Sequence, residues 1–113
     1  MKYSKHLSQP WFECIFNGSK TVEGRLNKGD FGKMEIGDEI EFYNDKSKYT
    51  VEITNVKYYK TFKEMITKEK LKNVLPTPDI TKIKDGVKVY HSFYSPEDEK
   101  KYGIVAIHIK VKK

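Results

Sequence analysis

The sequence contains little cysteine and no long hydrophobic run. Its one cysteine, Cys14, can form neither an internal disulfide nor a zinc site of its own, which is typical of a reducing compartment. No stretch approaches the ~20 apolar residues that a membrane-spanning helix needs. The first residues, MKYSKHLSQPW, lack the apolar segment of a secretory signal. We therefore expect an intracellular protein, most simply a cytoplasmic one, without membrane association, metal ion or cofactor.

Internal repeats, linkers and low-complexity segments are also missing from the 113 residues, which suits one domain, residues 1–113, with one modest core. The sequence is polar, with 34% charged residues, but eight tyrosines and six phenylalanines recur along its whole length. Such aromatic side chains supply large buried areas to a small core. The composition therefore indicates a folded chain and not a disordered one.

An Arg-rich tract is missing as well, although the formal net charge is +6 and the isoelectric point is about 9.2. A positive excess favours a polyanionic partner, most simply nucleic acid. Lysine, however, is spread over the whole chain, including its loops and its last residues. Charge alone therefore gives only weak support for a nucleic-acid partner.

Alternating apolar and polar residues predict about five strands. The last strand, for example, places Ile104 and Ala106 on one face and Val105 and Ile107 on the other. A polar interruption near Asn55 indicates a β-bulge in the fourth strand. The expected strands cover residues 2–7, 21–26, 39–43, 49–59 and 104–111.

A first helix is expected directly after the first strand. Ser8 as N-cap, Pro10 in the first turn and Gly18 after the end are the usual boundary signals of a short helix. Cys14 lies within it, and we expect its side chain to pack against the body of the protein. Residues 27–38 are rich in glycine and turn pairs, which predicts a loop.

Three more helical segments are expected in the second half of the chain. Thr61 can cap a helix that continues to about Leu71, and Asp79 opens an apolar pattern at three- and four-residue spacing that continues to Tyr94. The segment SPEDEKKYG has a serine cap, an early proline, acids at its start and a final glycine. Five strands interrupted by short helices lack the regular alternation of a parallel α/β sheet. We therefore predict an α+β fold with a small, mostly antiparallel β-barrel and peripheral helices.

The stretch GSKTVEGR concentrates reactive and charged side chains, and three interpretations of it are open. Thr21, Glu23 and Arg25 alternate with apolar residues, so they can be the solvated face of an edge strand. Alternatively, Lys20 and Arg25 can hold a phosphate or a base edge. In the third interpretation, Lys20, Thr21 and Glu23 perform acid–base or nucleophilic chemistry.

The stretch resembles the signature of the ASCH domain family, a branch of the PUA-like fold. That signature has the pattern G-x-K-x-x-E-x-R, which Gly18, Lys20, Glu23 and Arg25 match in register. The start LSQPW, the segment IGDEIEFYN and the final YGIVAIHI are also similar to the family's sequences, so the resemblance spans most of the chain. It implies a PUA-like β-barrel with a cleft beside the signature, where family members are proposed to bind RNA or nucleotides.

The resemblance also implies two possible reactions. Some bacterial relatives hydrolyse the acetyl amide of acetylcytidine with the signature lysine as base and a threonine as nucleophile. This chain keeps the lysine as Lys20, but Glu23 stands at the position of the nucleophile and Thr21 lies elsewhere in the motif. Glu64 and Glu69 are candidates for a further carboxylate. A few relatives are reported as ribonucleases, for which residues outside the motif can supply proton transfer; the candidates are His6, His91 and Tyr94.

Aromatic side chains can stack on an exposed base, as binders of single-stranded RNA require. Trp11 and Tyr94 are the candidates that we place in the cleft, and Tyr43, Tyr58 and Tyr59 are further possibilities. The basic run KYYK at 57–60 can follow an RNA backbone or be a solvated strand end.

Three hypotheses on function follow. The first is an RNA- or nucleotide-binding domain whose ligand contacts Lys20, Thr21, Glu23, Arg25, Trp11 and Tyr94. The second is a hydrolase of RNA or of a modified nucleoside with Lys20 and Glu23 as acid–base groups. The third is a protein-interaction module.

Overall fold

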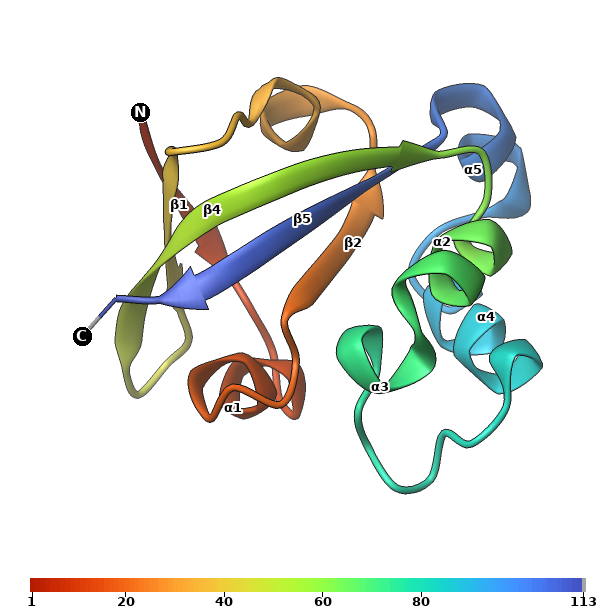
Figure 1. Cartoon of the computed structure of the whole chain (residues 1–113), viewed down its shortest axis with the longest axis horizontal. Coiled ribbons are helices and arrows are strands. Elements are labelled where there is room, and N and C mark those ends of the chain that lie inside the picture. The colour runs from red at the N-terminus through yellow and green to blue at the C-terminus, as the bar shows by residue number, and fades with distance from the viewer. Residues whose placement is uncertain (113) are drawn as a thin grey trace.

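The computed structural model describes residues 1–112, which fold around a five-stranded sheet (Figure 1). The strand order is β1-β3-β4-β5-β2; β1 is parallel to β3, and the other three pairs are antiparallel. The sheet curls into a half-barrel, so the predicted α+β fold with a mostly antiparallel, barrel-like sheet is confirmed. The strands are β1 (Lys2–His6), β2 (Val22–Leu26), β3 (Glu39–Tyr43), β4 (Lys48–Tyr59) and β5 (Ile104–Val111).

The helices are short, and α2 to α5 gather at one side of the sheet, next to β2 (Figure 1). Among residues 1–112, no helix is long and apolar enough to cross a membrane. The helical segments are α1 (Trp11–Phe16), the 3₁₀ helix η1 (Gly29–Lys33), α2 (Phe62–Glu69), α3 (Leu71–Val74), α4 (Ile83–His91) and α5 (Pro96–Tyr102).

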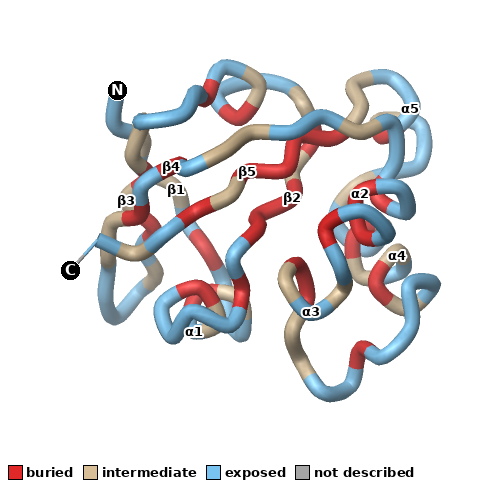
Figure 2. The backbone as a smooth tube through the Cα atoms, viewed as in Figure 1, coloured by how far each residue is buried: buried red, intermediate tan, exposed pale blue. Residues whose placement is uncertain are grey.

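Two hydrophobic clusters lie on opposite faces of β5. Val105 and Ile107 belong to the cluster inside the half-barrel, and Ile104 and Ala106 belong to the cluster under the helices. The neighbouring strand β2 lies between the same two clusters, and almost all of it is buried (Figure 2). Any polar side chain on the inner face of β2 is therefore removed from water, and it needs partners within the protein.

Several local predictions are confirmed. The ladder between β4 and β5 shifts register between Ile53 and Asn55, which is the expected bulge. The Thr61 side chain accepts a hydrogen bond from the Glu64 backbone N–H at the start of α2. Ser95 caps α5 in the same way, with Pro96 as the first residue of that helix.

Other boundaries were predicted wrongly. Ser8 does not cap α1, because Pro10 precedes the helix and no side chain caps it. The predicted loop 27–38 contains η1, since turn-rich sequences also suit a 3₁₀ helix. The helix after Thr61 breaks at Lys70, whose φ is +82°, and α3 follows it. The segment from Asp79 becomes helical only at Ile83.

Gly103 ends α5 in a conformation that other residues strongly disfavour, with φ 72° and ψ −173°. An added Cβ would also lie 3.1 Å from the carbonyl oxygen of Tyr59. We expect Gly103→Ala to lower the free energy of unfolding by ~1–3 kcal/mol, measured by urea denaturation. Gly29→Ala is the matched control, because Gly29 has φ +59° but open space around its Cβ position, and it should cost only about 1 kcal/mol. Equal losses would show that the contact with Tyr59 and the ψ angle of Gly103 have no effect.

Candidate functional site

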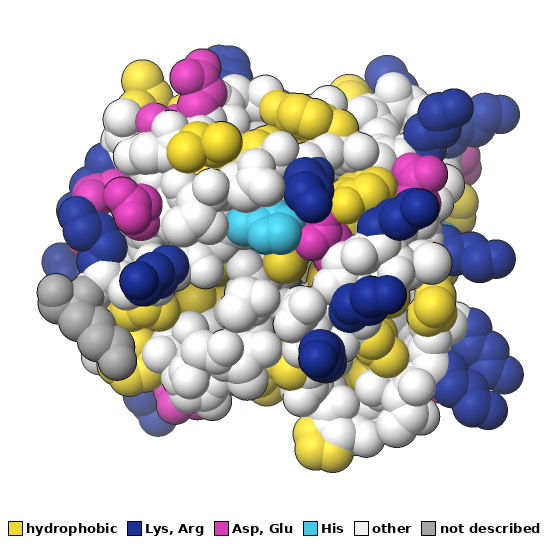
Figure 3. Space-filling model, in the orientation of Figure 1, with side chains coloured by type: hydrophobic (Ala, Val, Ile, Leu, Met, Phe, Trp, Pro, Cys, Tyr) yellow, Lys and Arg dark blue, Asp and Glu magenta, His cyan; other side chains and the backbone are white. Residues whose placement is uncertain are grey.

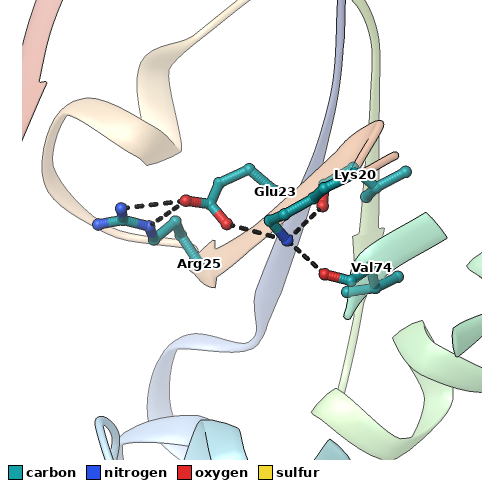
Figure 4. A network of polar contacts seen from close by, with 5 residues as sticks. Lys20, Glu23, Arg25 and Val74 are labelled. Atoms are coloured by element: carbon teal, nitrogen blue, oxygen red, sulfur yellow. Dashed lines mark hydrogen bonds and ion pairs between the residues drawn. The ribbon is translucent and has the colours of Figure 1, made fainter. Parts of the chain in front are cut away.

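The signature lysine is buried at the centre of a polar network (Figure 4). The Lys20 side chain is 1% exposed, and its Nζ donates hydrogen bonds to the carbonyl oxygens of Val22, at 2.8 Å, and Val74, at 2.5 Å. Its third contact is an ion pair with Oε1 of Glu23 at 3.4 Å. Two of the three donors of the ammonium are thus used in hydrogen bonds, and the ion pair adds a third contact within the protein. Lys20 thus joins β2 to the end of α3.

Glu23 stands between two cations. Its Oε2 accepts hydrogen bonds from Nη2 of Arg25 at 3.1 Å and from Nε of Arg25 at 3.3 Å, while Oε1 faces Lys20. The Glu23 side chain is 7% exposed and that of Arg25 is 23% exposed. The guanidinium of Arg25 also lies over the ring of Phe31, 4.5 Å from its centroid. The outermost member of the network is therefore the arginine.

Burial and pairing act in opposite directions on these charges. Burial lowers the pKa of Lys20 below its ordinary value, and the neighbouring Glu23 offsets this only in part. Burial alone would raise the pKa of Glu23, but the charges of Lys20 and Arg25 outweigh it and lower that pKa. Glu23 is therefore a carboxylate at neutral pH. The interpretation of Thr21, Glu23 and Arg25 as a solvated strand face is wrong for Glu23, which is buried, whereas Arg25 is partly buried and Thr21 is exposed.

The lowered pKa of Glu23 predicts a pH dependence of stability. A carboxyl whose folded pKa lies below its unfolded value of 4.5 stabilises the fold above pH 4.5, and this contribution is lost as the pH falls through the folded pKa. We expect Glu23→Gln to be less stable than the wild type at pH 7, with a difference that shrinks between pH 5 and ~pH 2. Urea denaturation at several pH values measures it.

Glu41→Gln is the control for this prediction. Glu41 lies on β3, and none of the ion pairs among the described residues involves it. The difference in the free energy of unfolding between Glu41→Gln and the wild type should change little over the same pH range. A Glu23→Gln difference that stays constant with pH would contradict the assignment of a charged Glu23.

A cleft with a volume of about 220 Å³ opens above the network. The signature supplies its charged residues. The others come from the end of β1 through the start of α1, from the residue after α3, and from the end of α4 with the residues after it. The polar residues of the cleft thus come from distant parts of the sequence and lie together beside β2. The lining residues are His6, Leu7, Ser8, Trp11, Lys20, Glu23, Gly24, Arg25, Leu75, Val89, Tyr90, Phe93 and Tyr94.

Tyr90 gives the cleft an unpartnered polar group. Its hydroxyl is buried and has no hydrogen-bond partner within the described part of the chain. Burial, with the nearby charge of Glu23, raises its pKa well above the ordinary value, so the hydroxyl stays protonated. The Tyr90 hydroxyl can lie here because residue 24 is a glycine. A Cβ on residue 24 would lie 3.2 Å from the Tyr90 oxygen and 2.6 Å from Sδ of Met65.

Aromatic rings line the walls of the cleft. Trp11 is half-buried, and its ring lies 5.7 Å from Nζ of Lys20. Tyr94 is half-buried and stacks on Phe62, whereas Phe93 is 62% exposed. The structure therefore brings Lys20, Glu23, Arg25, Trp11 and Tyr94 together, as the sequence-based hypothesis requires.

Thr21 does not join this group. It precedes β2, is exposed and does not line the cleft. Its backbone N–H donates to the Asn73 carbonyl, and its carbonyl accepts from the Ile109 N–H. The strand alternation placed Thr21 beside Glu23, but at this end of β2 the backbone joins α3 and β5. Thr21 therefore has a backbone role.

The other candidates lie outside the cleft, with the exception of His6. His91 contacts Glu99, Glu64 bonds to the Lys60 N–H, and Glu69 accepts from Tyr59 and approaches His108 at 2.9 Å. Tyr43 and Tyr58 are exposed but do not line the cleft. Cys14 is half-buried in α1, in agreement with packing against the body.

Two cleft residues have no signal in the sequence that separates them from core residues. Tyr90 continues the apolar spacing of α4, and Phe93 follows in the same aromatic run, YHSFY. The density of aromatic residues in that run was the only available indication. Their relation to Glu23 and Arg25 depends on how α4 packs against β2.

The model of one protein family, the ASCH domain, matches residues 6–113. The chain belongs to the ASCH domain family. Solved structures agree with this ASCH domain over nearly its whole length. The crystal structure of hypothetical protein PH0355 is 41% identical, with a TM-score of 0.91 over 99% of this chain and 100% of that chain. The solution structure of protein PF0455 from Pyrococcus furiosus is 37% identical, with a TM-score of 0.82 over 100% of this chain and 99% of that chain.

A more distant ASCH domain shares the fold alone. The ASCH domain from Lactobacillus crispatus is 16% identical, with a TM-score of 0.69 over 97% of this chain and 79% of that chain. A search of curated proteins gave no match. The resemblance inferred from GSKTVEGR is thereby confirmed at the level of the family.

Proposed function

We propose that this ASCH domain binds RNA by taking one unstacked base into the cleft. The observation that carries the proposal is the combination of a charged pair, Glu23 and Arg25, with the unpartnered hydroxyl of Tyr90 in a cleft that has aromatic walls. Sequence-specific RNA binders use stacking on aromatic side chains together with hydrogen bonds to base edges. Membership of a family linked to RNA supports the same conclusion.

The charged pair suits a base edge better than a phosphate. A carboxylate accepts hydrogen bonds, and a guanidinium donates them, so the two together match an edge that presents both donors and acceptors. The amino group of cytosine or guanine is a donor for Glu23, and a ring carbonyl is an acceptor for Arg25 or Tyr90. A bare phosphate would be repelled by Glu23.

Lys20 has a different part in this proposal. Its ammonium donates to the carbonyls of Val22 and Val74 and forms an ion pair with Glu23, so it is engaged within the protein. It is a positioning residue that holds Glu23 and the end of α3 at the floor of the cleft. Basic side chains elsewhere supply the long-range attraction; in Figure 3 they are spread over the visible face with acidic ones among them.

A hydrolase is the second candidate, and one observation favours it. Burial lowers the pKa of Lys20 beside a carboxylate, as a catalytic base requires. Against it, the Lys20 ammonium already donates to the carbonyls of Val22 and Val74, and Thr21, the hydroxyl that the chemical interpretation of the signature uses, does not line the cleft. The protein-interaction module stays a prediction with no specific contact in its support.

An NMR titration tests the proposal and its alternative together. The ¹⁵N-labelled protein would be mixed with the four common nucleosides and with a short RNA that contains one N4-acetylcytidine. Binding predicts shifts of amides in 20–25 and 89–94 with an intact acetyl methyl signal. Release of free acetate would identify a hydrolase, and the absence of shifts in these segments would refute the cleft as a binding site.

Phe93 provides a test that leaves the fold intact. Phe93→Ala removes a 62% exposed ring at the cleft, so we expect RNA affinity to fall about fivefold, near ~1 kcal/mol, the lower end of base-stacking energies. Fluorescence anisotropy of a labelled RNA measures the affinity. Phe16→Ala is the matched control, because Phe16 is 52% exposed and does not line the cleft. Equal losses in both variants would contradict stacking on Phe93.

A further inference from the structure

A second cavity adjoins the cleft. It has a volume of about 310 Å³ and is lined by His6, Ser8, Gln9, Asn44, Asp45 and Lys46. His6 and Ser8 line both cavities, so they form the boundary between them. A ligand whose base occupies the cleft can therefore extend over His6 and Ser8 into the second cavity.

The sheet topology creates this neighbourhood. β1 and β3 are parallel, and His6 pairs with Tyr43 at the end of the ladder. The Leu7 N–H continues the contact by donating to the Tyr43 carbonyl. Because parallel strands end at the same edge, segment 8–9 and the β3–β4 turn at 44–46 leave the sheet side by side. The second cavity lies between segment 8–9 and the turn at 44–46.

The two amide side chains of the cavity present donors. Oε1 of Gln9 accepts from the Glu13 backbone N–H at 3.1 Å. Oδ1 of Asn44 accepts from the backbone N–H groups of Lys46, at 2.9 Å, and Ser47, at 3.0 Å. Since the oxygens are engaged, the NH₂ groups remain for a ligand. The hydroxyl of Ser8 and the ring of His6 add donors at the boundary.

The charges of the second cavity differ from those of the cleft. Lys46 is exposed and takes part in none of the ion pairs among the described residues, so its ammonium is available. Asp45 is the one acidic residue of the lining and opposes an anion. The donors of Ser8, Gln9 and Asn44, together with the ammonium of Lys46, offset the negative charge of Asp45. In contrast to the cleft, the lining contains no Phe, Tyr or Trp, and its one ring is that of His6, at the boundary with the cleft.

We propose that the second cavity is a phosphate subsite, which receives the phosphodiester next to the base held in the cleft. The inference rests on the proposed function and makes it specific: the ligand is a nucleotide within an RNA strand and not a free nucleoside. The base enters the apolar, aromatic cleft, and the backbone leaves over His6 and Ser8 toward Lys46.

The test compares nucleosides with the same nucleosides that carry a 5′- or a 3′-phosphate, and with dinucleotides that contain them. Affinities would be measured by NMR titration for the wild type, Lys46→Gln and Lys48→Gln. Lys48 is the matched control, because it is exposed on the same hairpin but does not line the cavity. A higher affinity for the 3′- or for the 5′-phosphate identifies the side on which the RNA strand leaves the cleft. A further rise in affinity for the dinucleotide shows that the ligand is a strand and not a free nucleotide.

We expect the phosphate to raise wild-type affinity about fivefold at low salt, and we expect Lys46→Gln but not Lys48→Gln to lose most of this gain. Nucleoside affinity should be the same in all three proteins. If nucleosides bind in the cleft but phosphate adds nothing, or if both variants lose the gain equally, the subsite is refuted and the proposed function stands. If neither nucleosides nor nucleotides shift the cleft amides, both proposals fail.

Discussion

Replacing Lys20 by Met is expected to lower the free energy of unfolding by about 3–5 kcal/mol, as for other broken buried ion pairs. Methionine has a similar length but no charge, so Glu23 would lose one of its two cations while remaining buried. The carbonyl oxygens of Val22 and Val74 would lose a buried hydrogen-bond donor. Chemical denaturation monitored by tryptophan fluorescence measures the change, since Trp11 lies beside the network.

The double variant Lys20→Met/Glu23→Gln separates the ion pair from the other contacts of Lys20. If the pair is coupled, the double variant loses less stability than the sum of the single variants, by ~1 kcal/mol or more. Lys57→Met controls for the substitution itself, because Lys57 is exposed on β4. A loss below 1 kcal/mol for Lys20→Met would show that the network contributes little to stability.

This expectation changes how functional experiments on the signature are interpreted. A Lys20 variant that fails to bind RNA or to turn over a substrate has lost the support of α3 and of Glu23 as well as a charge. Loss of activity in such a variant is therefore no evidence for a catalytic lysine. Variants of Arg25, Tyr90 and Phe93 report on the ligand more directly, because they leave the hydrogen bonds from Lys20 to Val22 and Val74 in place.

The sequence predicted the strands well, because alternation is a local property. It predicted the position of Glu23 poorly, because the burial of β2 depends on distant parts of the chain. Helices at positions 62–102 cover the face of Val22 and Leu26, and the cluster inside the half-barrel lies at the other face. The carbonyl of Val74, which accepts a hydrogen bond from Lys20, is 54 residues away from it in the sequence. A strand with a polar face looks solvated until the elements that cover it are known.

The cleft was predictable only in part, for a similar reason. The signature located Lys20, Glu23 and Arg25, since the family resemblance marks them. Tyr90 repeats the apolar spacing of α4, so its pattern is that of a core residue, and most of its ring is indeed in the core. Only the packing of Tyr90 against Gly24 brings it into the same cleft as Glu23 and Arg25.

Tyr90→Phe is therefore expected to change stability and affinity in opposite directions. The hydroxyl is buried without a partner, so its removal should leave the free energy of unfolding unchanged or raise it by up to about 1 kcal/mol. The ring keeps its stacking on Phe62, whose centroid is 4.3 Å away. In the complex, a polar atom of the base would lose its hydrogen-bond partner, so RNA affinity should fall tenfold or more, ~1–3 kcal/mol.

Tyr59→Phe is the matched control, because it should show the reverse pattern. The Tyr59 hydroxyl donates to Glu69 at 2.5 Å, and Tyr59 does not line the cleft. Its removal should cost ~1–3 kcal/mol of stability, since Glu69 is buried and loses a donor, and should leave RNA affinity unchanged. A Tyr90→Phe protein that binds RNA as tightly as the wild type would place the base away from the Tyr90 hydroxyl. A protein that is both less stable and weaker in binding would make Tyr90 a structural residue whose hydroxyl has a partner inside the fold.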